Sequence, residues 1–144
     1  MSTERFNIFS FNGKMKVLHL SWIAFFITFV VWFNLAPMLQ AMAHSLGLSK
    51  SEIKTLLLLN VSLAIPARII VGMLTDIYGP RKIYSGLLLL ASFPCIAFAM
   101  ANTFEQAAIA RFILGFVGAG FVIGIRMVSE WFPANELGLS LIHI

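Results

Sequence analysis

Arg68 is the residue whose type and position point most directly to chemistry. It lies in the stretch 55–74, which is otherwise largely apolar and long enough to cross a bilayer. A charged side chain at membrane depth costs about 2.5 to 3.5 kcal/mol on insertion scales, so it marks a functional site by default. A guanidinium presents a planar fork of donors that fits a flat oxyanion, which a lysine cannot reproduce. The sequence therefore predicts an anion site at Arg68.

The residues around Arg68 suggest that its side chain faces other helices. Asn60 and Gly72 fall on one broad, partly polar face with Arg68 at helical spacing, and the opposite side is Leu and Ile. Pro66 removes a backbone donor and frees the carbonyl of Ser62, an irregularity that is tolerated where helices line a cavity. The alternative is that Arg68 reaches the interface, because it lies about six residues, roughly 9 Å, from the end of the stretch.

Composition predicts the elements that must position this arginine. The chain is 60% hydrophobic and 11% charged with a mean hydropathy of +0.93, far from the usage of soluble domains. Helices are expected, because backbone polar groups in lipid must be satisfied within the segment. The sequence predicts an all-α membrane protein whose four transmembrane helices cover about 17–39, 55–74, 83–100 and 104–123.

Other kinds of chemistry have little support in the sequence. The lone Cys95 excludes an intrachain disulfide, and no pair of Cys or His has metal-ligand spacing, so we expect no metal and no cofactor. The six acidic residues and three isolated histidines form no catalytic constellation, so we expect no enzyme. The net charge of +4 comes mostly from Lys and Arg at helix ends, which argues against nucleic-acid binding.

The basic residues also predict an orientation. Arg5, Lys14 and Lys16 precede the first helix, and Arg81 and Lys82 stand between the second and third. On the opposite side the connection 40–54 carries Lys50 and Lys54. The positive-inside rule then places the N-terminus in the cytoplasm.

The turn between the second and third helices carries the strongest motif. Its residues follow the order Gly, x3, Asp, x2, Gly, Pro, Arg, Lys, and they are Gly72, Asp76, Gly79, Pro80, Arg81 and Lys82. Gly72 permits close approach of a neighbouring helix, and Gly79 permits positive φ in the sharp turn. The carboxylate of Asp76 is free to pair with a cation from another helix. The less specific alternative is a generic charged turn.

With this motif the chain resembles the major facilitator superfamily. Ile77 after the Asp and Pro80 before Arg81 depart from the general form of the motif and resemble the nitrate/nitrite porter branch. The segments 32–37 (WFNLAP) and 64–72 (AIPARIIVG), with Phe132 and Pro133, agree with that branch.

The resemblance implies a fold, a function and candidate residues. It implies secondary active transport of nitrate or nitrite by alternating access in a multi-pass protein of the plasma (inner) membrane. Arg68 matches the anion-binding arginine of these porters, and Phe33, Asn34 and Asn60 are further candidates for the substrate site. The fold uses about twelve helices in two halves, so the chain would be an N-terminal fragment, a single partial domain over 1–144, whose partners include the bilayer and the missing helices.

The fourth helix carries an arginine followed by glycines, which resembles a superfamily pattern. Small residues at this spacing permit close helix packing, which we expect for Gly115, Gly118, Gly120 and Gly124. Arg111 is a weaker candidate for a role in transport, because snorkelling to the outer interface explains it equally well.

Arg126 and Glu130 lie one turn apart near the cytoplasmic end of the same helix. With Asp76 and Arg81 they are predicted to form an ion-pair cluster that holds one conformation closed. The alternative is that all four charges are simply solvated. Trp22, Trp32 and Phe33 are expected to face lipid or the interface more often than to contact a ligand, although the resemblance implies aromatic rings beside the anion.

Two further alternatives stay open on the sequence alone. The residues after about Gly138 depart from the expected glycine-rich fifth helix and suggest a truncated or misread terminus. The product would then be non-functional, or a small four-helix membrane protein that contacts partners through the helix-four glycines. The sequence does not distinguish nitrate, nitrite or another small anion, nor proton symport from anion exchange.

Overall fold

The described part of the chain is helical throughout its regular structure. The computed structural model describes residues 10–133 together with Glu136, Gly138 and Ile142. Its elements are α1 Gly13–Phe33, α2 Leu35–Ser45, α3 Lys50–Ser62, α4 Ala64–Tyr78, α5 Pro80–Ala99, α6 Phe104–Leu114, the 3-10 segment η1 Gly115–Ala119 and α7 Gly120–Trp131. The predicted all-α class is confirmed.

Within the described residues, consecutive elements join into four spans that are long and apolar enough to cross a membrane. They are Gly13–Ser45, Lys50–Tyr78, Pro80–Ala99 and Phe104–Trp131. The four predicted membrane helices are confirmed within the described part of the chain. The predicted bounds were too short for the first, second and fourth, and the third begins at Pro80 instead of residue 83. Hydropathy marks the length that lipid surrounds, whereas a helix continues into polar residues wherever its ends can be capped.

The first connection shows how a cap extends a helix. Ser49 Oγ accepts a hydrogen bond from the backbone N–H of Glu52 at 3.3 Å, and the Glu52 carboxylate accepts one from the backbone N–H of Ser49 at 2.8 Å. This reciprocal pair is a capping box, and it starts α3 at Lys50. The connection expected over 40–54 therefore shrinks to residues 46–49.

The expectation of a misread terminus concerns the last residues of the chain. Residues 139–141, 143 and 144 lie outside the described residues. That expectation, and the assignment of 1–144 to a single partial domain, stay predictions.

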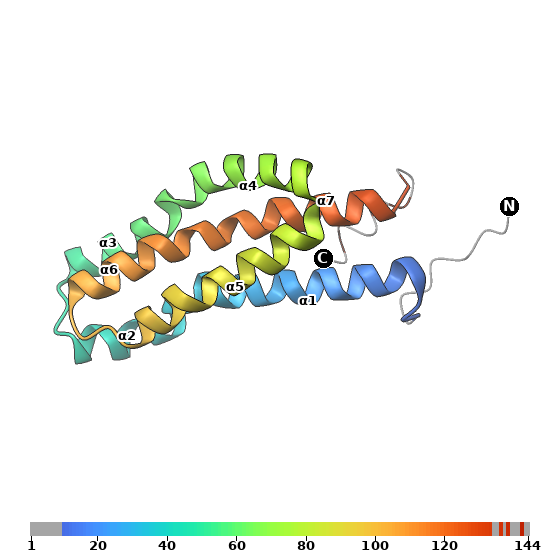
Figure 1. Ribbon diagram of the computed structural model, residues 1–144. Helices are drawn as coiled ribbons and strands as arrows, with labels where there is room; N and C mark the ends of the chain where they lie inside the picture. Colours follow the sequence, from blue (N-terminus) through green and yellow to red (C-terminus); the bar gives the residue numbers. More distant parts are fainter. Residues whose placement is uncertain (1–9, 134–135, 137, 139–141, 143–144) are drawn as a thin grey trace, which may run out of the picture.

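The four spans run alternately up and down, with the fourth at the centre of the bundle. Figure 1 shows α6 and α7 (orange) lying between α1 (blue) and the pair α3 and α4 (green). In the most apolar stretch of each span, the buried share is 56% for the fourth and between 11% and 22% for the other three. The fourth span is therefore the element against which the others are positioned.

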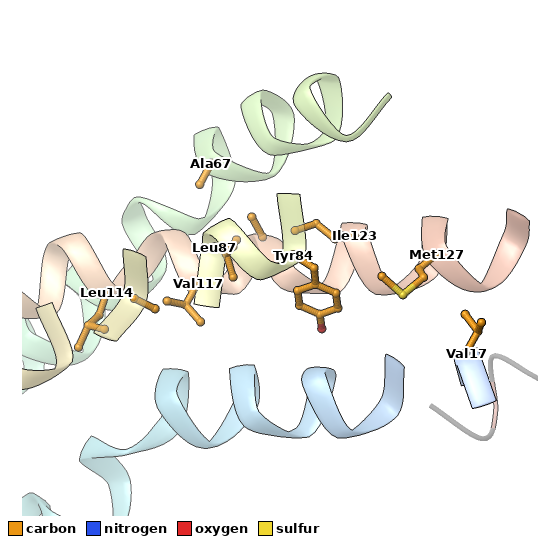
Figure 2. Packing of buried hydrophobic residues seen from close by; sticks show 10 residues of the cluster. Val17, Ala67, Tyr84, Leu87, Leu114, Val117, Ile123 and Met127 are labelled. Carbon is orange, nitrogen blue, oxygen red and sulfur yellow. The ribbon is translucent and has the colours of Figure 1, made fainter. Parts of the chain in front are cut away.

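The apolar core follows this centre. Leu114, Val117 and Ile123 of the fourth span pack with residues of the other three spans, including Val17, Ala67, Tyr84 and Leu87 (Figure 2). Inside a membrane this packing gains mainly van der Waals contact, because lipid tails are as apolar as the side chains they would replace.

Glycines let the neighbouring spans approach the fourth. A Cβ on Gly115 would stand 2.7 Å from the Asn60 carbonyl oxygen, one on Gly118 3.0 Å from both Ala64 and Trp32, and one on Gly120 2.9 Å from Thr28. Gly124 is less tightly packed, since its nearest neighbour would lie at 3.4 Å. The first three glycine positions are thus occupied by contacts within the chain, which argues against the idea that they form a face for an outside partner.

The outer faces of the bundle are apolar. Large exposed hydrophobic side chains are spread along α4 and α5, among them Ile65, Ile69, Ile70, Met73, Leu89, Leu90, Phe93 and Ile96. A soluble protein rarely exposes so much apolar surface. This exterior agrees with a multi-pass integral membrane protein.

Candidate functional site

Three of the four spans are interrupted, and the interruptions lie together. The first span is interrupted at Asn34 and the second at Leu63. In each case a proline lies four residues after the last residue of the preceding helix, Pro37 after Phe33 and Pro66 after Ser62. A proline ring removes one backbone hydrogen bond and clashes with the carbonyl four residues earlier, which explains both interruptions. The η1 segment of the fourth span lies beside them, as the glycine contacts with Asn60, Ala64 and Trp32 show.

Arg111 is buried at this junction. Its side chain is only 2% exposed, and its guanidinium donates from Nη1 to Asn34 Oδ1 at 2.6 Å and from Nη2 to the Trp32 carbonyl at 2.8 Å. Its Cζ also lies 5.6 Å from the centre of the Phe98 ring. The alternative that Arg111 snorkels to the interface is therefore wrong, because both terminal nitrogens are bound to the broken end of α1.

Trp32 and Asn60 connect the first two interruptions. Asn60 Nδ2 donates to the Trp32 carbonyl at 3.1 Å, and Trp32 Nε1 donates to the Asn60 carbonyl at 3.4 Å. Asn60 is 5% exposed and Trp32 is half-buried. The expectation that Trp32 faces lipid or the interface was wrong, because its polar atoms bind the second span.

Arg68 reaches into the same junction from α4. Its Nε donates to the Gly118 carbonyl at 3.3 Å, and its Cζ lies 5.9 Å from the centre of the Trp32 ring. The side chain is half-buried and turned toward η1, not toward the end of its span, so the snorkelling alternative for Arg68 is wrong. Nη1 and Nη2 of Arg68 have no hydrogen-bond partner among the described residues, so they are available to a ligand.

The other substrate-site candidates, Asn34, Asn60 and Phe33, also lie near this junction but differ in their contacts. Asn34 and Asn60 belong to the hydrogen-bond network around Trp32. Phe33 is half-exposed and belongs to a row of aromatic rings, 4.9 Å from Trp32 and 5.6 Å from Phe29 between ring centres. At this junction two buried polar atoms, Asn60 Oδ1 and Arg111 Nε, have no hydrogen-bond partner within the described residues. Unpaired buried groups are costly, and each one requires a physical explanation, such as strain, a catalytic role or a bound water or ion.

A second group of charges lies at the far end of α4 and α7. Arg126 Nε lies 3.4 Å from Asp76 Oδ1 and 3.5 Å from Glu130 Oε1. Arg81, the fourth member of the predicted cluster, lies 5.8 Å from the Trp131 ring centre instead. The structure thus brings three of the four charges together. All three side chains are at least 40% exposed, so the ion pairs contribute little to stability.

The turn beside this charge cluster has the predicted geometry. Gly79 alone separates α4 from α5, at φ 86° and ψ 151°, and Pro80 begins α5. Lys82 is exposed in the first turn of α5. Gly72 is less closely packed than expected, since a Cβ there would meet only Val122 Cγ1, at an ordinary 3.6 Å.

The tertiary contacts of this junction were not predicted from the sequence. The residues Arg111 and Asn34 lie 77 positions apart, and no local pattern pairs them. Lys14, whose Nζ lies 2.6 Å from Glu136 Oε2, was equally unexpected as a tertiary contact. Three or more His, Cys, Asp or Glu side chains do not gather anywhere in the described part of the chain, so those residues offer no metal site of that kind.

Comparison with known proteins places the chain in a family. It matches the Major Facilitator Superfamily over residues 21–142. It is 54% identical over 92% of its length to the nitrate/nitrite transporter NrtP of Picosynechococcus sp., and 50% identical over 92% to NrtP of Nostoc punctiforme. It is also 32% identical over 89% to the probable nitrate/nitrite antiporter NarK1 of Thermus thermophilus.

The matches cover only part of these relatives. The chain spans 25%, 27% and 29% of their respective lengths. No solved structure matched the chain. Because the family match covers most of the chain, from within the first span to beyond the fourth, the protein belongs to the Major Facilitator Superfamily.

Proposed function

We propose that these residues form the N-terminal part of a secondary active transporter that moves nitrate or nitrite across the membrane by alternating access. The observation that carries the proposal is the position of Arg68, with its guanidinium turned into the bundle and both terminal nitrogens without a described partner. Two relatives that are at least 50% identical are named as nitrate/nitrite transporters, which supports the same class of anion.

Arg68 has the chemistry that this substrate requires. Nitrate and nitrite are small, flat oxyanions, and a guanidinium donates two parallel hydrogen bonds to such a group. A bound anion would also neutralise a charge that is costly at membrane depth. Asn34 Oδ1 and Asn60 Nδ2 are already bound within the protein, so we assign the direct contact to Arg68 and a supporting role to the two asparagines.

The charge cluster of Asp76, Arg126 and Glu130 is the proposed gate on the cytoplasmic side. It connects α4 with α7 through weak, exposed ion pairs, which form and break at little cost. Gly72, Gly79, Arg81 and Lys82 belong to the same proposed gating region. The remaining helices of the whole transporter would supply the second side of the anion site.

The proposed location is the plasma (inner) membrane, with the N-terminus in the cytoplasm. The end of the bundle that contains the α4–α5 turn carries Lys14, Lys16, Arg81, Lys82 and Arg126, whereas the opposite end carries Lys50 and Lys54. The positive-inside rule favours this orientation.

The first experiment measures nitrate and nitrite uptake by the full-length protein that contains these residues, and compares the Arg68→Lys variant with the parent protein. The variant keeps the positive charge but loses the planar pair of guanidinium donors. We therefore expect the loss of a charge-assisted hydrogen bond that contributes about 1.5 to 3 kcal/mol to anion binding. That corresponds to an apparent affinity lower by roughly 10- to 100-fold. Protein in the membrane fraction is measured alongside, and we expect it to be unchanged.

The matched control is Lys54→Arg, which exchanges the same two side chains at an exposed position near the start of α3. Its uptake should equal that of the parent protein. Normal uptake of both anions by Arg68→Lys would refute the assignment of Arg68. Failure of the parent protein to take up either anion would refute the substrate class.

A further inference from the structure

Arg111 has the environment of a positioning group rather than of a ligand. Its two terminal nitrogens are bound to Asn34 and to the Trp32 carbonyl, and only 2% of the residue is exposed. Arg68, by contrast, is half-buried and leaves both terminal nitrogens without a described partner. The two arginines of this region therefore have different roles, and only Arg68 can meet an incoming anion directly.

The contacts of Arg111 fall on the interrupted end of α1. A helix end leaves its last carbonyls without intrahelical partners, and the Trp32 carbonyl is one of these. Arg111 Nη2 and Asn60 Nδ2 both donate to it, at 2.8 and 3.1 Å. This carbonyl is thus held from the fourth span and from the second span at once.

The Trp32 side chain connects these contacts to Arg68. Its Nε1 donates to the Asn60 carbonyl at 3.4 Å, which limits rotation of the indole. The ring centre lies 5.9 Å from Arg68 Cζ, within the range of a cation–π interaction. Fixed contacts therefore lead from Arg111 through Trp32 to Arg68.

We infer that Arg111 is a positioning residue, which holds Trp32 at the end of α1 and thereby sets the position of the Arg68 guanidinium. The part that concerns the anion rests on the proposed function of Arg68. The part that concerns Trp32 stands on the hydrogen bonds alone, so the two can be tested separately.

The first measurement is fluorescence of the full-length protein in which every tryptophan other than Trp32 is replaced by Phe. Arg111→Gln should shift the emission of Trp32 to longer wavelength and increase its quenching by iodide, because the carbonyl contact is lost. Phe112→Leu, at the neighbouring position that is 41% exposed, is the matched control and should leave the emission unchanged. An unchanged emission in Arg111→Gln would overturn the inference, whether or not the protein transports nitrate.

The second measurement separates KM from the maximal rate of nitrate uptake. A misplaced anion ligand weakens substrate binding, so Arg111→Gln should raise KM by roughly tenfold while the rate per inserted molecule changes little. Arg111→Lys, which can still reach one of the two acceptors, should recover part of the loss. A purely structural role would instead lower the amount of inserted protein at an unchanged KM, and that result would overturn the inference.

Discussion

Gly115 of η1 meets the Asn60 backbone so closely that a Cβ would stand 2.7 Å from the carbonyl oxygen. Real Cβ atoms are not found at such distances, and the opposing atom is backbone, which cannot rotate away. The second and fourth spans are therefore in direct backbone contact at this point. Neither helix can shift away from the other without moving the site that contains Trp32 and Arg68.

The Gly115→Ala variant should be destabilised. Overpacking a closely packed interior costs about 1 to 3 kcal/mol, and here the strain falls on two helices. The effect is measured as thermal stability in detergent, from the fraction of protein that stays monodisperse after heating. Gly86→Ala is the control, because a Cβ there would meet no described residue within 4 Å. Equal stability of the two variants would show that the close approach is not constraining.

Gly79→Ala should also destabilise the protein, but for a conformational reason. At φ 86° and ψ 151° the backbone occupies a region that is essentially restricted to glycine, and a side chain there costs on the order of 1 to 3 kcal/mol. No described residue lies within 4 Å of the added Cβ, so the expected cost comes from the backbone conformation of Gly79 itself. The same heating assay measures the loss. Stability equal to that of Gly86→Ala would contradict the geometry of the turn.

The ion pair between Asp76 and Arg126 should matter for transport rate more than for stability. Because both side chains are at least half exposed, the double reversal Asp76→Arg with Arg126→Asp should change stability by only about 0 to 1 kcal/mol. Each single reversal should alter the maximal uptake rate, and the double variant should recover part of it. Transport rates that stay at the parent value in both single variants would mean that the pair is solvated and has no gating role.

Orientation can be tested with single cysteines. In the full-length protein with all native cysteines, including Cys95, replaced by Ser, Lys82→Cys should react with a membrane-impermeant maleimide only after the cells are broken. Lys50→Cys, at the opposite end of the bundle, should react in intact cells. Labelling of Lys82→Cys in intact cells would reverse the proposed topology.

The sequence predicted the elements more fully than the contacts between them. The four membrane helices followed from apolar runs, because lipid imposes the same length and hydropathy on every span. The sharp turn at Gly79 was predictable because the residue types that such a turn needs are few. The helix ends were predicted too short, since caps such as Ser49 with Glu52 extend a helix beyond the region that hydropathy detects.

The candidate site was predictable in part, for a physical reason. Arg68 could be found because a single charge in an apolar stretch stands out, and its helical face suggested its direction. The contacts of Arg111 and Trp32 could not be found, because they depend on how distant spans pack. An arginine near a helix start has the same local sequence whether it snorkels or is buried. Arg81 likewise has a charge that suits an ion pair, yet lies against the Trp131 ring.

The 3-10 winding of Gly115–Ala119 determines which way the ends of the fourth span face. Each 3-10 residue advances the helix by about 120° around its axis, whereas an α-helical residue advances it by about 100°. The five residues of this segment therefore rotate the chain roughly 100° further than five α-helical residues would. In a continuous α-helix Arg111 and Arg126 would point about 60° apart, whereas with the segment they point roughly 160° apart. The tighter winding thus allows Arg111 to point toward α1 while Arg126 points toward α4, on nearly opposite sides of the fourth span.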